Sequence, residues 1–262
     1  MTRIKIIRII VPLLLSGIVA AFTLFLVKDH VQYKEIYDDV AAWGVFFSVF
    51  GIVYAIIAGF LLVTVLTRYS NLNQTLEDEL NAIETVRDFL TYLGDEQKEA
   101  KRAIKRALLH YATSLLDKEW AEMVDSREPT DSDTSEELYE LMRKSKEIGV
   151  DSENDRVVFS VIIETISDIA KLRTRRIALA NDRLPPRLKL LLIFMSIIII
   201  VSFVLLGVQN FYIHQIMLVS LIVSIQLLYM IIEDLDHPFH GIWNINRMPL
   251  EELLKRFKAE VS

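Results

Sequence analysis

The chain has no cysteine among its 262 residues, so it can form neither a disulfide nor a thiolate metal site. It also lacks a glycine-rich phosphate-binding loop and a nucleophile elbow, and no arrangement of serine, histidine and aspartate typical of a hydrolase can be defended. These absences remove the usual sequence signals of catalysis and of nucleotide binding. We therefore expect a protein that is not an enzyme and that uses no cofactor.

Histidine is scarce as well, with five residues, of which only His237 and His240 lie close together in the sequence. With Asp234 and Asp236 these two could in principle form a metal site. However, Pro238 interrupts the helical spacing that would align the four side chains. A solvated segment leaving a membrane explains the same polarity, so the sequence predicts no metal site.

Charge is missing from four long stretches of the chain. Hydrophobic residues make up 52% of the sequence, and the mean hydropathy of +0.34 is high for a soluble domain of this size. A helix needs about 20 apolar residues to cross a ~30 Å hydrocarbon core. The stretches that meet this requirement are 9–27, 40–67, 190–213 and 214–232. They predict four transmembrane helices, and because no strand-like alternation is visible, the expected fold class is all-α.

The first of these stretches follows Arg3, Lys5 and Arg8, which is also how a cleavable signal peptide begins. The stretch is longer than a usual signal-peptide core. The residues after it, 28–30, offer no small-residue cleavage pattern. We therefore interpret 9–27 as a transmembrane helix.

Orientation follows from the positions of lysine and arginine, which accumulate in short cytoplasmic flanks. Basic residues precede the first and third stretches, whereas 29–39 has a single lysine and 209–215 has no charge. Both termini are therefore expected in the cytoplasm. The expected organisation is transmembrane helices one and two in 1–66, a helical cytoplasmic domain in 67–187, transmembrane helices three and four in 188–234, and a cytoplasmic C-terminal segment in 235–262.

Helical spacing of apolar residues continues beyond the second stretch, from Leu76 to Leu93. Because the second stretch contains no proline, we expect one unbroken helix over 40–93. Further helices are expected over 95–120, 134–148 and 152–184. The last of these should end before Pro185 and Pro186, of which Pro186 suits the first turn of the third span.

The second stretch has two distinct faces. Small residues occupy roughly one third of its circumference; they are Gly44, Ser48, Gly51, Ala55, Ala58, Gly59 and Leu62. We interpret this face as a close helix contact rather than the lining of a wide pore. The other face carries the pore-lining candidates Phe46, Phe50, Tyr54, Ile57, Leu61 and Thr64. It could face lipid, neighbouring helices, or a narrow hydrophobic constriction in an oligomeric pore.

A basic stripe precedes the third stretch. It consists of Arg173, Arg175, Arg176, Arg183, Arg187 and Lys189. These cations could set the topology beside anionic lipid. They could also attract anions to a cytoplasmic antechamber, or form ion pairs with Glu79, Glu84 and Glu119.

Five short motifs follow one another in order along the chain. They are FGIVYA at 50–55, ELNA at 79–82, YA at 111–112 with EW at 119–120, the segment from RR at 175–176 to LP at 184–185, and LDHPFHG at 235–241. With the spans between them, they resemble the bacterial bestrophin-like membrane family over nearly the whole chain. The motif residues singled out by the resemblance are Glu79, Asn81, Glu119, Trp120, Pro185, Asp236, Pro238, Phe239 and Gly241.

The resemblance implies a function, because bestrophins are oligomeric anion channels with four spans per subunit and a pore lined by the second helix. It implies a homo-oligomer, with a pentamer as one candidate stoichiometry, in the inner membrane of a bacterium. The implied partners are membrane lipid and inorganic anions, with no nucleic acid. Bestrophins carry an acidic calcium-binding run after the last span; here Pro238 and Phe239 lead instead into IWNI at 242–245, so calcium gating at that place is not expected.

A second hypothesis comes from a different functional class. The four predicted spans contain no charged residue, whereas transport pathways usually contain some. The chain could therefore be a non-conducting membrane scaffold or sensor whose cytoplasmic helices bind a partner.

Reporter fusions test the predicted topology. A reporter placed after Leu93 or at Ser262 is expected in the cytoplasm, and one inserted near Tyr37 outside it, because of the distribution of lysine and arginine. Alkaline phosphatase, which is active only outside the cytoplasm, and a fluorescent protein provide the two readouts. Cytoplasmic fluorescence from the insertion near Tyr37 would overturn the charge argument.

Overall fold

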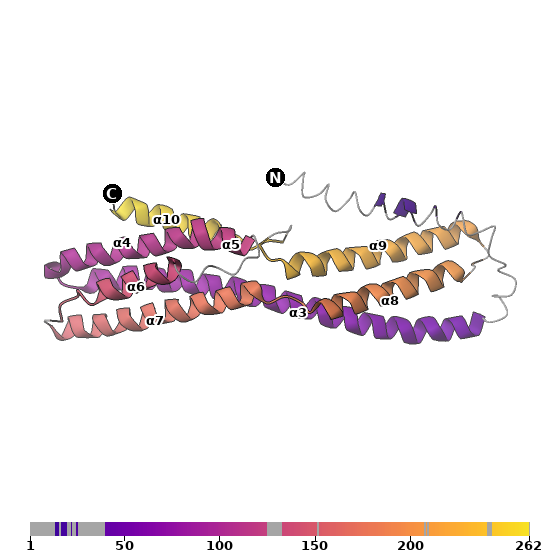
Figure 1. Ribbon diagram of the computed structural model, residues 1–262, viewed down its shortest axis with the longest axis horizontal. Helices are drawn as coiled ribbons and strands as arrows, with labels where there is room; N and C mark the ends of the chain where they lie inside the picture. The colour runs from indigo at the N-terminus through magenta and orange to yellow at the C-terminus, as the bar shows by residue number, and fades with distance from the viewer. Residues whose placement is uncertain are drawn as a thin grey trace. The chain divides into compact units, whose positions relative to one another are not determined.

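The computed structural model describes residues 14–15, 17–19, 22, 25, 40–124, 133–150, 152–206, 208, 210–239 and 243–261. Within these ranges every regular element is a helix (Figure 1), so the expected all-α fold class is confirmed. The predicted first span, 9–27, lies largely outside the described residues. The segment 29–39 and the residues His240 and Gly241 lie outside them altogether.

The helices group into two compact units. The apolar unit comprises 1–67, 183–237 and 241–243, and the polar unit comprises 68–182, 238–240 and 244–262. Helix α3, Val40–Phe89, is uninterrupted over its 50 residues and contributes its first part to the apolar unit and its second part to the polar unit. The predicted helix over 40–93 is therefore confirmed in all but its last residues, where the 3-10 turn η2, Leu90–Tyr92, follows.

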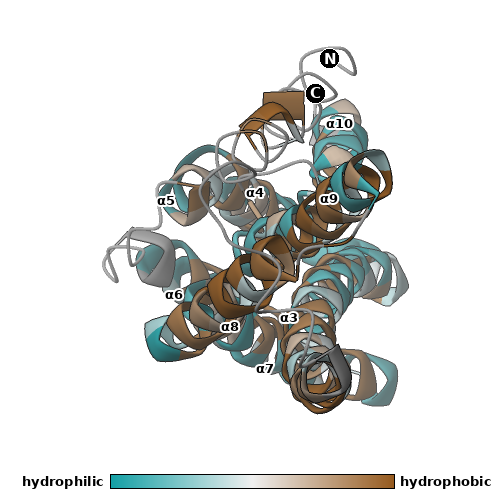
Figure 2. Cartoon of the chain, turned by 90° about the vertical axis from the view of Figure 1, so that its right-hand side faces the viewer, coloured by the Kyte–Doolittle hydropathy of each residue, from teal (hydrophilic) through white to brown (hydrophobic). Residues whose placement is uncertain are grey.

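The apolar unit also contains α8, Pro186–Leu205, and α9, Phe211–Asp236. Both helices are coloured as hydrophobic along most of their length in Figure 2. Pro186 occupies the first turn of α8, as predicted. The predicted division of these spans at 213–214 is wrong, because α9 begins at Phe211, where the Asn210 side chain accepts hydrogen bonds from the amides of Tyr212 and Ile213. An unbroken apolar run hides such a boundary, and the capping asparagine was the available signal.

Among the described residues, three helical stretches are long and apolar enough to cross a membrane. They are Ala42–Tyr92, Glu153–Leu205 and Phe211–Asp236. These correspond to the predicted second, third and fourth spans. Because the first predicted span lies largely outside the described residues, the count of four remains a prediction.

Besides the second part of α3 and the turn η2, the polar unit contains further helices and helical turns. They are η3, Asp95–Gln97; α4, Lys98–Ser114; the π-helical turn η4, Leu115–Glu119; α5, Trp120–Val124; α6, Asp133–Ser145; α7, Glu153–Asn181; and α10, Met248–Val261. The predicted helices over 95–120, 134–148 and 152–184 therefore all occur, with shifted ends. Ser152 caps α7 by accepting a hydrogen bond from the amide of Asp155.

One apolar core fills the polar unit, and α3, α4, α7 and α10 all contribute to it. Helix α10 was missed by the sequence analysis, which treated 235–262 as a segment without predicted helices. Its buried residues are Leu250, Leu253, Leu254 and Phe257. This spacing places all four side chains on one helical face, so the pattern to predict α10 was present in the sequence.

Candidate functional site: one face of α3 and a buried ion cluster

In the apolar unit, α3 has a covered face and an exposed face. Ala58, Leu61 and Val65 are at most 3% exposed and pack within the unit. On the opposite side lies a row of apolar residues, each at least 60% exposed: Val45, Val49, Ile52, Ile56, Phe60 and Val63. Steps of three and four residues place them along one side of the helix. We call this row the exposed stripe.

The predicted aromatic candidates lie on or near the covered face. The Ser196 hydroxyl of α8 donates a hydrogen bond to the Tyr54 hydroxyl over 3.2 Å, and Leu61 is 1% exposed. Phe46 and Phe50 stack on each other with ring centroids 5.2 Å apart. These two, with Ile57 and Thr64, are half-buried. Within one chain, then, this face is partly or fully covered, and Tyr54 on it contacts α8.

The predicted small face does not form a close contact within the described residues of one chain. A Cβ atom built on Gly44, Gly51 or Gly59 would meet no atom within 4 Å apart from adjacent residues and the nearby backbone of α3 itself. Ala58 is the buried member of that face. The space beside these glycines is therefore open among the described residues.

The polar unit encloses a cluster of five buried polar side chains, which we call the buried ion cluster. Arg176 of α7 donates through Nε to Glu79 Oε2 of α3 over 2.6 Å and through Nη2 to Glu119 Oε2 over 2.5 Å. Arg173, one helical turn earlier, donates to Glu119 Oε1 over 2.7 Å. The Tyr111 hydroxyl donates to Glu79 Oε1 over 2.5 Å. Three segments far apart in the sequence thus meet at one arginine.

Local structure explains why Glu119 reaches this cluster. The turn Leu115–Glu119 is π-helical, which adds one residue to the turn and changes the direction of the side chains after it. Glu119 then points toward α7, and the next residue, Trp120, packs edge-on against Phe239 with centroids 5.4 Å apart. On α7, the spacing of three residues places Arg173 and Arg176 on the same face.

Opposite charges within the cluster favour the ionised forms of Glu119 and Arg176. Burial disfavours the Glu119 carboxylate, but Arg176 and Arg173 outweigh burial and lower the pKa of Glu119. Burial likewise opposes the Arg176 charge, yet Glu79 and Glu119 raise the pKa of Arg176. Burial, followed by the charge of Glu79, raises the pKa of Tyr111, which therefore stays protonated as a donor. Two guanidinium groups satisfied in this way are not available to bind a passing anion.

Two members of the basic stripe belong to the buried ion cluster, and two more are held by α9. Lys189 forms ion pairs with Asp236 at 2.7 Å and Glu233 at 2.8 Å, and Arg183 donates to the Asp236 carbonyl. Asp236 also accepts from the Leu184 amide, which ties the end of α9 to the segment before α8. The remaining arginines of the stripe, Arg175 and Arg187, are exposed. Of the expected acidic partners, Glu84 instead pairs with Arg256 of α10.

The structure brings several of the motif residues together. Glu79 and Glu119 share Arg176, while Trp120 and Phe239 contact each other. The carbonyl of Pro238 accepts from the Ile245 amide. Asn81 and Pro185 are exposed and do not join this group. Among the residues that the structure describes, no three histidine, aspartate or glutamate side chains gather in a way that would hold a metal ion.

This chain and its fold are similar to those of known proteins. Residues 11–250 match the model of a family described as a Bestrophin-like domain. The chain belongs to the Bestrophin-like family. Two crystal structures of variants of a bacterial Bestrophin homolog from Klebsiella pneumoniae have TM-scores of 0.70 and 0.71 at 18% and 17% identity. The first match covers 97% of each chain, and the second covers 98% of this chain and 96% of the homolog.

A crystal structure described as that of a membrane protein also matches this Bestrophin-like chain. Its TM-score is 0.70 at 17% identity, and 97% of each chain is covered. No curated protein matches the chain. At identities this low, these matches show a shared fold alone. The family and the helices of the described residues that are long and apolar enough to cross a membrane indicate a membrane protein.

Variants of two neighbouring arginines on α7 test how much the buried ion cluster contributes to stability. Arg176→Gln leaves two buried carboxylates without their shared cation, so we expect the free energy of unfolding to fall by about 3–5 kcal/mol. Arg175→Gln is the matched control, because Arg175 is exposed; its effect should stay within about 0.5 kcal/mol. Unfolding of the full chain in detergent, followed by circular dichroism, measures both. Equal stability of the two variants would contradict the buried pairing.

Proposed function

We propose that this Bestrophin-like chain is a subunit of a homo-oligomeric ion channel whose pore is lined by the exposed stripe of α3. One observation carries the proposal: a row of apolar side chains, each at least 60% exposed, runs along a helix whose opposite face is packed. A cyclic assembly brings the same face of every subunit to a common axis. Ile52, Ile56 and Phe60 are each one helical turn apart and would form successive apolar rings, which can gate a pore by shedding water.

The covered face is a weaker candidate for the pore lining. Leu61 is 1% exposed, and the Tyr54 hydroxyl is bonded to Ser196 of the same chain. A side chain packed inside its own subunit cannot also line an axis between subunits. The six candidates selected from the sequence thus give way, in this proposal, to the residues of the exposed stripe.

The location, topology, stoichiometry and conducted ion of the proposed channel are argued from the family and from the distribution of charge. We propose an inner-membrane location with both termini in the cytoplasm, as the distribution of lysine and arginine predicts. The stoichiometry is proposed as a closed ring, with a pentamer as one candidate. The resemblance implied inorganic anions, but the basic stripe supports them less than expected, because Arg173 and Arg176 are buried in ion pairs.

Single cysteine substitutions on α3 test which side chains line the proposed pore, because the chain has no thiol of its own. A thiol reagent such as Ag⁺ is expected to block most of the current of reconstituted Ile56→Cys protein, since that side chain would face the pore. Leu61→Cys is the control on the covered face, where burial should keep the thiol unreactive. Bilayer recordings before and after the reagent provide the measurement.

Other results would argue against the proposal. Block of Leu61→Cys without block of Ile56→Cys would move the lining to the covered face. An Ile56→Cys current that survives the reagent would place the stripe against lipid. Absence of current from the native oligomer and from both variants would favour the scaffold or sensor hypothesis.

A further inference from the structure

A buried carboxylate of α6 lacks one of its expected partners. Glu137 is 6% exposed, and its Oε1 accepts a long hydrogen bond from the Lys118 ammonium over 3.4 Å. Its Oε2 is buried as well, yet no donor of the described residues bonds to it. A buried carboxylate oxygen without a donor has lost its hydration without compensation, so such an atom requires a physical explanation.

The other buried carboxylates that the structure describes in the polar unit have partners at both oxygens. Both oxygens of Glu79 and both of Glu119 accept hydrogen bonds within the buried ion cluster. The two oxygens of Asp155 accept from a backbone amide and from a serine hydroxyl at the start of α7. Glu137 is therefore the exception among these four residues.

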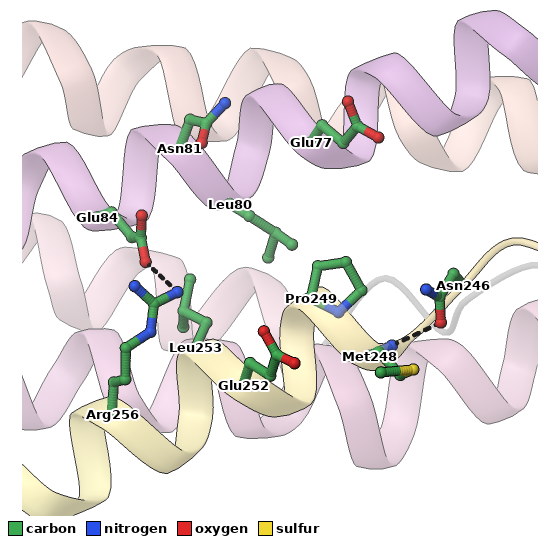
Figure 3. Close-up of a pocket in the computed structure, with 10 residues that line it drawn as sticks. All are labelled: Glu77, Leu80, Asn81, Glu84, Asn246, Met248, Pro249, Glu252, Leu253 and Arg256. Atoms are coloured by element: carbon green, nitrogen blue, oxygen red, sulfur yellow. Dashed lines mark hydrogen bonds and ion pairs between the residues drawn. The ribbon is translucent and has the colours of Figure 1, made fainter.

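A groove in the polar unit shows the contrasting situation. It lies between α3 and α10, has a volume of about 480 Å³, and is lined in part by Glu77, Glu84 and Glu252 (Figure 3). Glu77 and Glu252 are exposed, so water solvates their charge. Glu84 forms an ion pair with Arg256 over 2.6 Å. The charges there are either hydrated or paired, and they call for no ligand.

Glu137 lines a cavity of about 530 Å³, which we call the α4–α6 cavity because its lining comes from α4, η4 and α6. Charges of both signs surround it, and three carboxylates face two permanent cations. With a neutral histidine, the lining carries one more negative than positive charge. The charged side chains of the lining are Glu136, Glu137, Glu140, Lys118 and Arg143, and the histidine is His110.

Contacts within the chain use only part of this lining. The Nε2 atom of His110 lies 3.7 Å from Glu137 Oε1, and the Nδ1 atom lies 3.7 Å from Glu140 Oε2, so both distances exceed that of a hydrogen bond. Arg143 is exposed and forms no ion pair with another described residue. The chain therefore provides neither a donor for Glu137 Oε2 nor an anion for Arg143.

We propose that the α4–α6 cavity binds a basic α-amino acid. An ammonium group has three donors and supplies the hydrogen bond that Glu137 Oε2 lacks. The carboxylate of the same molecule binds the planar guanidinium of Arg143. A second ammonium group on the ligand side chain balances the remaining negative charge of the lining. This site lies within the polar unit and does not depend on the proposed channel.

Isothermal titration calorimetry of the full chain in detergent, with L-lysine as the probe, tests the proposal. L-lysine is expected to bind the native protein. Glu137→Gln keeps the shape of the side chain but removes its charge, and should weaken binding by about tenfold or more. Glu99→Gln is the matched control, because Glu99 is an exposed carboxylate of α4 that does not line the cavity; its affinity should equal that of the native protein.

Cadaverine, which is lysine without the carboxylate, tests the role of Arg143. It should bind the native protein more weakly than L-lysine does, because it offers no anion to the guanidinium. Arg143→Gln should remove this difference by weakening the binding of L-lysine without weakening that of cadaverine. A general loss of structure would weaken both ligands alike, so the comparison separates recognition from folding.

Each unfavourable result overturns a particular step. Equal affinity of the native protein and Glu137→Gln for L-lysine contradicts the role of Glu137. A preference for L-lysine over cadaverine that survives in Arg143→Gln contradicts the placement of the carboxylate. Absence of binding to the native protein at millimolar L-lysine, with the fold verified by circular dichroism, overturns the proposal and leaves the cavity to water. If Glu137→Gln does not fold, the comparison at the exposed Arg143 still decides.

Discussion

Arg176 holds two buried carboxylates at once, and this contact fixes which side of α3 faces the core of the polar unit. Glu79 lies eighteen residues after Leu61, so the two share the covered side of the helix. Leu61 anchors that side by apolar packing in one unit, and Glu79 anchors it by ion pairing in the other. In the apolar unit, the opposite side of α3 carries the exposed stripe. The proposed pore lining lies on this opposite side of the uninterrupted helix.

The anchor differs in character from a hydrophobic contact. Burying charges is costly, and an apolar replacement of similar size often stabilises a protein as well or better. A buried pair does, however, accept few alternative registers, because a shifted helix would leave a charge unpaired. Arg176, with partners on α3 and at the end of η4, thus penalises rotation or sliding of α3 past its neighbours. A helix that presents a defined face to other subunits benefits from such a penalty.

Much of the fold could be predicted from the sequence, because the responsible signals are local. Uncharged runs predicted all three helical stretches of the described residues that can cross a membrane. Apolar residues spaced three and four apart predicted α4 and α7. Pro186 marked the start of α8. The boundary between α8 and α9 was misplaced because apolar residues continue through it, and α10 was overlooked although its apolar spacing is regular.

The candidate site was less predictable, because it depends on pairing between distant segments. From the sequence alone, Arg173, Arg175 and Arg176 were not distinguished from one another. Only the fold shows that two of these arginines are buried and that one is exposed. The sequence pattern suggested a face of small residues and a face of aromatic residues on α3. The exposed stripe consists of valine, isoleucine and phenylalanine and corresponds to neither of these two faces. Residue type alone does not reveal which apolar face packs inside a subunit and which remains available.

The mass of the purified protein in detergent tests the central claim most directly, since a pore along the exposed stripe requires a closed ring of subunits. The account predicts one assembly whose protein mass is a whole-number multiple of the 30.2 kDa chain and which contains several copies in cyclic symmetry. Native mass spectrometry provides this value without assuming a shape. A protein that is monomeric under conditions that preserve its fold would contradict the account.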